Sequence, residues 1–184
     1  MENKTLLLKS AMFYGLFLGG FWVLKYVFFI IGARHPVLLS VYWILTSLTI
    51  VFAYVFTRVY KMLIGGRIGF FHAWQFGILL YLFSALIVSL LHYVFYRYLA
   101  PPDYIARMMD IALSLVREMN LNPQMEDTFG QMPEVTPIRL TIQGIFNNIF
   151  YGLILSVPVA AILYRKPTEG FSFNQEEKNQ KPNQ

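Results

Sequence analysis

The chain has 184 residues, of which 57% are hydrophobic and only 14% are charged. A soluble domain carries about a quarter charged residues, so this composition excludes an ordinary water-soluble globular protein. There is no cysteine, which excludes disulfides and thiolate chemistry. The net charge is +5, but the basic residues lie beside apolar stretches, and we therefore expect no binding to nucleic acid.

The apolar residues gather in four long runs. About 20 helical residues cross a hydrocarbon core of roughly 30 Å, and each run reaches that length. The runs are apolar at consecutive positions, whereas the strands of a membrane β-barrel alternate. We predict an all-α integral membrane protein with four transmembrane helices, at about residues 11–32, 37–57, 73–98 and 140–164.

The first run resembles a secretory signal only in part. Lys4 and Lys9 form a basic segment before it. However, the apolar stretch is longer than that of a typical signal, Lys25 interrupts it, and no small-residue cleavage site follows. We expect the run to be retained as the first span.

The basic residues predict the orientation, because Lys and Arg in short loops near the spans favour the cytoplasmic side. One side of the four spans holds Lys4, Lys9, Arg58, Lys61, Arg67, Arg165, Lys166, Lys178 and Lys181. The other side holds Arg34, Arg97, Arg107, Arg117 and Arg139, spread over a longer length. Both termini are therefore predicted to be cytoplasmic. The Lys and Arg of the inner connection, residues 58–72, are expected to rest on anionic lipid headgroups.

The segment between the third and fourth spans predicts an extracytoplasmic amphipathic helix over about residues 103–121. Pro101 and Pro102 end the span, and Asp103 is suited to cap a new helix. Its apolar residues recur with helical spacing at Ile105, Met108, Met109, Ala112, Leu113, Val116 and Met119. A short helix cannot bury such a stripe alone, so we expect it to contact the membrane surface, the ends of the spans or a partner.

The domain organisation is correspondingly simple. We predict a four-span membrane domain over residues 1–167, with an irregular loop at residues 122–137. Residues 168–184 are polar and lack the apolar content to fold, which predicts a disordered cytoplasmic tail.

Lys25 is the sharpest candidate for function, because it lies within a span and no span contains Asp or Glu. Its side chain could extend outward to lipid headgroups or to an outer carboxylate, form hydrogen bonds with a purely structural role, or have a functional role. Residues of the other spans at comparable depth are Thr46, His92, Asn147 and Asn148. Our hypothesis is a polar intramembrane cluster of these residues with Lys25; the alternative is that they share depth by chance or only join the helices.

Other motifs point to packing rather than chemistry. Gly15 and Gly19 allow close helix approach, either within the chain or between two copies. The methionines of the outer segment could bind Cu(I), but most belong to the apolar stripe, and we expect filler and no metal. No catalytic motif occurs, so we expect neither an enzyme nor a cofactor.

Several short motifs carry a family resemblance. They are Ala11-Met-Phe-Tyr-Gly15 with Gly19-Gly20, Ile68-Gly-Phe-Phe-His-Ala73-Trp-Gln-Phe-Gly77, Thr136-Pro137, and Gly152 through Ala160-Ala161 to Arg165-Lys166-Pro167. Over residues 5–167 the chain resembles the bacterial domain-of-unknown-function family 4199. The resemblance implies a small four-span protein of the Gram-negative inner membrane, and it brings no activity or catalytic residues.

Three functions remain open on this basis. The first is a non-enzymatic accessory or assembly component that acts through the outer amphipathic helix. The second is a small oligomeric transporter or channel that uses the polar cluster around Lys25. The third, an intramembrane enzyme, has the least support. The expected partners are the lipid bilayer and either a membrane protein or a second copy of the chain.

Overall fold

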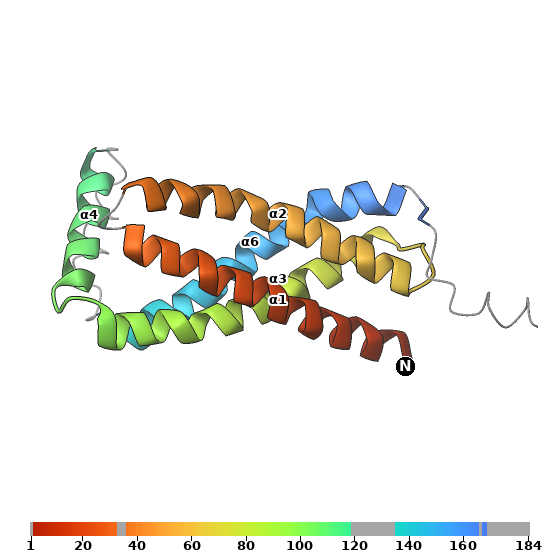
Figure 1. Ribbon diagram of the computed structural model, residues 1–184, viewed down its shortest axis with the longest axis horizontal. Coiled ribbons are helices and arrows are strands. Elements are labelled where there is room, and N and C mark those ends of the chain that lie inside the picture. Colours follow the sequence, from red (N-terminus) through yellow and green to blue (C-terminus); the bar gives the residue numbers. More distant parts are fainter. Residues whose placement is uncertain (1, 33–35, 119–134, 166, 169–184) are drawn as a thin grey trace, which may run out of the picture. The chain divides into compact units, whose positions relative to one another are not determined.

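The computed structural model describes residues 2–32, 36–118, 135–165 and 167–168. Every regular element in these ranges is helical (Figure 1). The elements are α1 (Glu2–Gly32), α2 (Pro36–Leu63), α3 (Phe70–Val94), the π-helical turn η1 (Phe95–Leu99), α4 (Tyr104–Glu118) and α6 (Pro137–Arg165). The all-α class predicted from the sequence is confirmed.

Four helices are long and apolar enough to cross a membrane: Lys4–Gly32, Ser40–Leu63, Phe70–Leu99 and Pro137–Arg165. The chain is therefore a multi-pass membrane protein. Helices extend beyond the apolar runs, since α1 already begins at Glu2 and α6 at Pro137. Propagating a helix costs little once a span has nucleated it, and proline suits the first helical position because it needs no intrahelical donor there.

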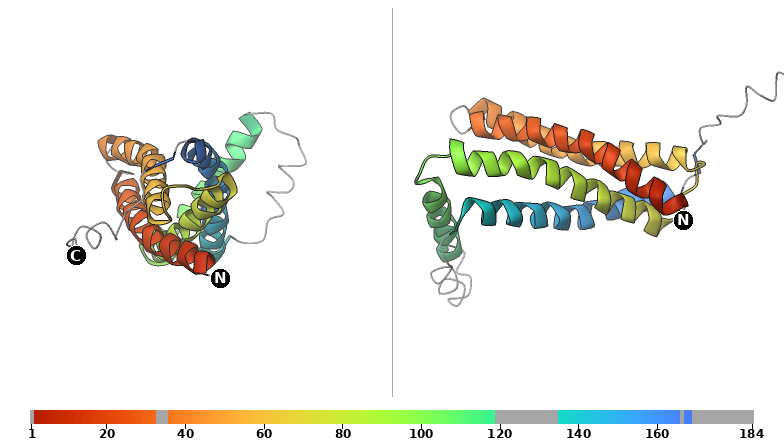
Figure 2. Two further views of the ribbon diagram at one scale, coloured as in Figure 1. Left: turned by 90° about the vertical axis from the view of Figure 1, so that its right-hand side faces the viewer. Right: turned by 90° about the horizontal axis from the view of Figure 1, so that it is seen from below.

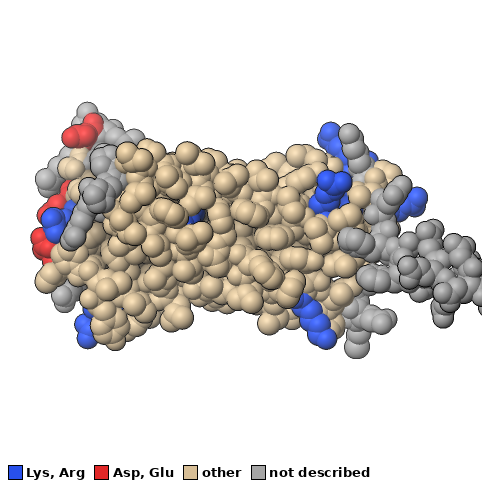
Figure 3. All heavy atoms as spheres, viewed as in Figure 1, with Lys and Arg blue, Asp and Glu red and all other residues tan. Residues whose placement is uncertain are grey.

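The surface of the long helices agrees with a lipid environment. Large apolar side chains are exposed on them, including Phe13 at 57%, Trp43 at 61% and Phe146 at 68%. Figure 3 shows a face of these helices with almost no charged atoms along its middle. A monomer in water rarely exposes such an extended apolar surface, whereas lipid tails solvate it without cost.

The chain divides into two compact units. Unit 1 comprises Met1–Val88 and Ile145–Gln184, and unit 2 comprises Ser89–Gly144. In unit 1 the helices neighbour one another in the cyclic order α1, α2, α6, α3, which the end-on view of Figure 2 shows. One contact establishes each neighbouring pair. The Tyr14 ring of α1 stacks on Phe56 of α2, and the Lys61 side chain of α2 is hydrogen-bonded to the carbonyl of Leu163 in α6. The Trp74 side chain of α3 is hydrogen-bonded to the carbonyl of Leu153 in α6, and Gly15 of α1 packs against Phe83 of α3.

Glycines let α3 approach both of its neighbours closely. A Cβ atom on Gly15 of α1 would lie 2.6 Å from the Cβ of Phe83. One on Gly152 of α6 would lie 2.5 Å from the Cβ of Tyr81. Such separations are below van der Waals contact, so only glycine permits this packing. Gly20, in contrast, faces open space.

Unit 2 contains the end of α3, η1 and α4. The amide of Ala100 donates to the carbonyl of Phe95 at 2.8 Å, which closes the π-helical turn. The Tyr104 ring at the start of α4 meets Phe95 edge-on at 5.4 Å. Burial raises the pKa of the Tyr104 hydroxyl, and nearby Tyr96 raises it further. These aromatic contacts attach α4 to the end of the third long helix.

Asp103 does not use its carboxylate as we expected. Its Oδ1 accepts a hydrogen bond from the Arg107 guanidinium at 2.8 Å, one helical turn along α4. Both side chains are exposed, so this pair contributes little to stability. Met119, the loop up to residue 134 and the tail from residue 169 lie outside the described residues.

Candidate functional site

The turn between α2 and α3 gives the end of unit 1 its shape. Gly66 N–H donates to the carbonyl of Lys61 at 2.9 Å, and Gly65 N–H donates to the carbonyl of Met62 at 3.3 Å. These are the two bonds of a Schellman motif, which ends a helix with residues in the left-handed region. Gly65 and Gly66 supply that conformation, with φ of 96° and 81°. The motif turns the chain so that Ile68 is buried and Arg67 stays exposed.

Lys61 joins α2 to the end of α6. Its side chain is 1% exposed, and its Nζ donates to the carbonyl oxygen of Leu163 at 2.7 Å. Leu163 lies in the last turn of α6, where carbonyls lack intrahelical partners and carry the negative end of the helix dipole. A lysine there satisfies one carbonyl and neutralises part of the dipole. The Thr168 amide adds a bond to the carbonyl of Gly66 at 3.0 Å.

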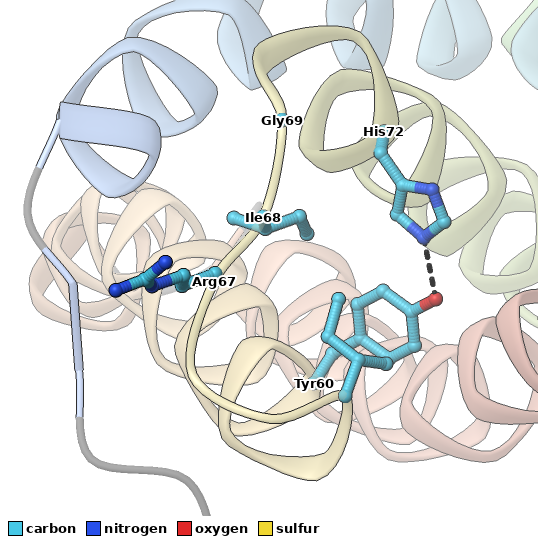
Figure 4. Close-up of a pocket in the computed structure, with 6 residues that line it drawn as sticks. Tyr60, Arg67, Ile68, Gly69 and His72 are labelled. Carbon is cyan, nitrogen blue, oxygen red and sulfur yellow. Dashed lines mark hydrogen bonds between the residues drawn. The ribbon is translucent and has the colours of Figure 1, made fainter.

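A stack of three rings occupies the interior beside this turn. Tyr60 is fully buried, and its ring lies parallel to that of Phe76, with centroids 4.3 Å apart. The His72 ring is parallel to Tyr60 at 5.7 Å. A hydrogen bond of 2.7 Å joins the Tyr60 hydroxyl and His72 Nε2, as Figure 4 shows. The stack and the bond hold the start of α3 against the end of α2.

Two pockets open at this end of unit 1, and Arg67 and Ile68 line both of them. The first has a volume of about 250 Å³ and includes Tyr60 and His72 in its wall. The second has a volume of about 300 Å³ and is lined also by Lys61, Tyr164 and Pro167. Figure 4 shows that the Arg67 side chain points away from the Tyr60–His72 pair. None of the described residues that line either pocket is acidic.

Exposed cations gather at the same end of unit 1 as these pockets. The helix ends of unit 1 that meet here carry exposed cationic side chains, which appear in blue at the right of Figure 3. They are Lys4, Lys9, Arg58, Arg67 and Arg165. The arrangement attracts anions, and the desolvated wall formed by Ile68 and Tyr60 strengthens that attraction locally.

Lys25, the candidate from the sequence, is half-buried between two aromatic rings. Its Nζ lies 5.5 Å from the centroid of the Trp22 ring and 5.4 Å from that of Tyr42. No hydrogen bond or ion pair joins it to any residue that the structure describes. Aromatic faces attract a cation through their quadrupole, and this cation–π contact is the partner that α1 and α2 provide.

The remaining members of the predicted polar cluster are not bonded to Lys25. Thr46 donates to the carbonyl of Tyr42 in its own helix at 2.8 Å. Asn147 is exposed and Asn148 is half-buried on α6. His92 belongs to unit 2, where its Nδ1 lies 3.6 Å from the Cβ position of Gly144. Within unit 1 the structure therefore places Lys25 among aromatic rings rather than among these polar side chains.

Among the residues that the structure describes, a few buried polar atoms in the interior of unit 1 have no hydrogen-bond partner. They are Trp22 Nε1, Tyr81 OH and Thr49 Oγ1. The Trp22 and Tyr81 rings meet edge-on at 5.6 Å. Buried polar atoms without partners are rare, and ordered water or a ligand commonly accounts for them.

The predicted packing glycines lie against α3. A Cβ on Gly19 would be 2.8 Å from the Cβ of Ile87, one helical turn beyond the contact of Gly15 with Phe83. Both contacts are within one chain, so the pair has an intramolecular role. On α4 the predicted stripe is half-buried at Ile105, Met109 and Leu113 and exposed at Met108; the side chains of Ala112 and Val116 lie outside the described set.

A model of one protein family matches residues 13–165 of the chain, and its description reads "Protein of unknown function (DUF4199)". The chain belongs to this family. The matched range contains most of all four long helices and both Lys61 and Arg67. Comparison with curated proteins and with solved structures gives no significant match.

The sequence did not predict the contacts of Tyr60, Lys61 and His72 in this DUF4199 protein. Lys61 was counted only among the basic residues near the spans, and neither the Tyr60–His72 bond nor the pockets were foreseen. A usable signal existed in Gly65-Gly66, because two glycines after a helix favour a Schellman ending. That ending places Lys61 and Arg67 at the same turn, although it does not reveal that α6 ends beside them.

Proposed function

We propose that this protein is a non-enzymatic component of the bacterial inner membrane that engages a membrane-protein partner through α4. The proposal depends chiefly on one observation. Met108 and Ile111, on the same side of α4, are 44% and 60% exposed, although α4 lies outside the four apolar spans. Its other apolar residues Ile105 and Met109 are half-buried. A second apolar ridge is thus left for a partner.

The chemistry of this ridge suits a protein surface. Methionine is flexible and polarizable, and it adapts to irregular apolar surfaces. The exposed pair Asp103 and Arg107 flanks this ridge, because Asp103, Arg107 and Ile111 are spaced four residues apart along one side of the chain segment that forms α4. Because α4 starts at Tyr104, shortly after η1 ends at Leu99, a partner in the same membrane lies within reach. Lipid headgroups are the competing occupant of the ridge.

The orientation with both termini in the cytoplasm is part of the proposal. It is supported by the exposed cations at one end of unit 1, where α1 begins and α6 ends, since short basic segments favour the cytoplasmic side. α4 is then extracytoplasmic. A reporter fused after Lys181 tests this directly: activity of a cytoplasm-specific reporter is expected, and activity of a periplasm-specific one would overturn it.

The partner is tested by photo-crosslinking in native membranes, with the reactive amino acid placed at Met108, Ile111 or, as the control on the other side of α4, exposed Ala106. We expect one protein of defined mass to crosslink from the first two positions and not from Ala106. It should also co-purify at fixed stoichiometry, and Ile111→Glu should abolish this without lowering the protein's own level. Adducts only with lipid, or equal crosslinking from Ala106, would overturn the proposal.

A second candidate function, a small transporter or channel, is favoured by the unpartnered Trp22 and Tyr81 atoms near Lys25. Water at such atoms could form part of a polar path. Proteoliposomes loaded with a pH-sensitive dye test it with the variant Lys25→Leu and the surface control Lys9→Leu. Flux that Lys25→Leu abolishes and Lys9→Leu preserves would support transport. Flux equal to that of empty liposomes would count against it.

A further inference from the structure

We propose that the pocket lined by Lys61, Arg67 and Tyr164 binds a phosphate group, as carried by the headgroup of an anionic phospholipid. The site lies in unit 1, at the end where α2 and α6 finish. The proposal is independent of the function proposed for α4, because that helix belongs to unit 2.

Arg67 is placed to reach a ligand from outside. The Schellman turn at Gly65 and Gly66 presents it as an exposed side chain at the pocket wall. Figure 4 shows it directed away from the Tyr60–His72 pair, and therefore not toward the other pocket's polar wall. A guanidinium presents several N–H donors in a planar fork that matches two oxygens of a phosphate group.

Lys61 supplies a second, fixed charge. Its ammonium is buried and held at 2.7 Å from the carbonyl of Leu163, so its position is determined before any ligand arrives. An anion in the pocket would add a charge of opposite sign beside it. Preorganised cations in a partly desolvated wall interact more strongly than the same charges in water.

The remainder of the wall favours a lipid over a free ion. Ile68, Tyr164 and Pro167 supply apolar surface beside the two cations. The volume of about 300 Å³ leaves room for atoms attached to the phosphate, such as a glycerol backbone. In the orientation proposed above, on which this step rests, this end of the helices is cytoplasmic, and basic pockets between membrane helices on that side commonly bind anionic headgroups. The other pocket that Ile68 and Arg67 line does not include Lys61, so we assign the site to this one.

The experiment compares Arg67→Gln with Arg58→Gln in the full-length protein purified in a neutral detergent. Arg58 is also exposed at the end of α2 but lines neither pocket, which makes it a matched control for net charge. Binding of short-chain phosphatidylglycerol is measured by the rise in Tm over a lipid titration. Inorganic phosphate is titrated in a parallel series.

We expect saturable binding that Arg67→Gln weakens about tenfold and Arg58→Gln changes by less than about twofold, because only Arg67 makes charge-assisted bonds to the ligand. Saturation with phosphatidylglycerol alone identifies the lipid headgroup as the source of the phosphate. Saturation with inorganic phosphate at similar concentration identifies a free ion at the same site. The Tm without ligand is expected to be equal in both variants.

Two results would overturn the site. Equal weakening by Arg58→Gln would show that the lipid responds to diffuse surface charge. Linear rather than saturable responses in every series would show that no discrete site exists. Lys61→Gln serves as the second variant, provided that it remains folded, and it is expected to weaken binding as much as Arg67→Gln does.

Discussion

Two lysines in unit 1 occupy contrasting environments. Lys61, at the end of α2, is fully buried and bonded to the carbonyl of Leu163. Lys25, in the C-terminal third of α1, is half-buried, and its Nζ lies close to the rings of Trp22 and Tyr42. The difference follows from where backbone acceptors are available. The last carbonyls of a helix lack intrahelical partners, whereas those within a span are already used. A lysine at a helix end can therefore be buried with a bond, and one within a span depends on aromatic faces, water or headgroups.

The largest effect is expected from Lys61→Met, which keeps the volume and removes the charge. It should lower the free energy of unfolding by about 2–3 kcal/mol, because it leaves the carbonyl of Leu163 without its charged donor. Unfolding titrations in mixed detergent micelles measure this. Arg58→Met, at an exposed position of the same helix, should change the value by less than about 0.5 kcal/mol. Equal losses would show that net charge, not the bond, matters at this end.

Gly15→Ala tests the packing of the helix that carries Lys25. The new Cβ would lie 2.6 Å from the Cβ of Phe83, which belongs to a rigid part of that side chain. We expect a loss of about 2 kcal/mol from overpacking. Gly20→Ala is the matched control, since nothing lies within 4 Å of its Cβ position. It should be neutral or stabilising by up to about 1 kcal/mol, through helix propensity. Equal effects of the two would contradict the close approach.

Lys25→Met should raise the free energy of unfolding, whereas Lys61→Met lowers it. A lysine within a span costs about 2.5–3.5 kcal/mol on insertion scales, and the cation–π contacts and snorkelling offset only part of this. We therefore expect a gain of about 1 kcal/mol in the same unfolding titrations. A loss as large as that of Lys61→Met would show that Lys25 has a strong acceptor, such as an ordered water.

The smallest effect is expected from Tyr60→Phe, which removes the hydroxyl that meets His72 Nε2 but keeps the stack on Phe76. The loss should be about 0.5–1 kcal/mol, the typical net worth of one neutral hydrogen bond. Phe76→Leu removes the stacked ring and should lower the free energy of unfolding by more than Tyr60→Phe does. If the loss of stability from Tyr60→Phe instead equalled that from Lys61→Met, the Tyr60–His72 hydrogen bond would stabilise this end of the bundle as strongly as the lysine does.

Composition and hydrophobic length were sufficient to predict the all-α class, the four long apolar helices and a helix between the third and fourth. These features are local, because about 20 consecutive apolar residues determine both the solvent and the helical state of their own segment. The family resemblance was also legible in short motifs and is confirmed by the match over residues 13–165. The sequence also predicted a comparable depth for Lys25, Thr46 and Asn147, but equal depth does not say which way each side chain faces.

Only the tertiary structure decided which helices are neighbours. The order α1, α2, α6, α3 brings Leu163 of α6 beside Lys61, more than a hundred residues earlier in the chain. The same order sets Gly15 against Phe83 and makes the pocket of Lys61, Arg67 and Tyr164. Apolar periodicity cannot encode this, because any apolar face can pack against any other or against lipid. Neighbours are selected instead by close fit at glycines and by the few polar groups that need a partner, and both depend on the whole bundle.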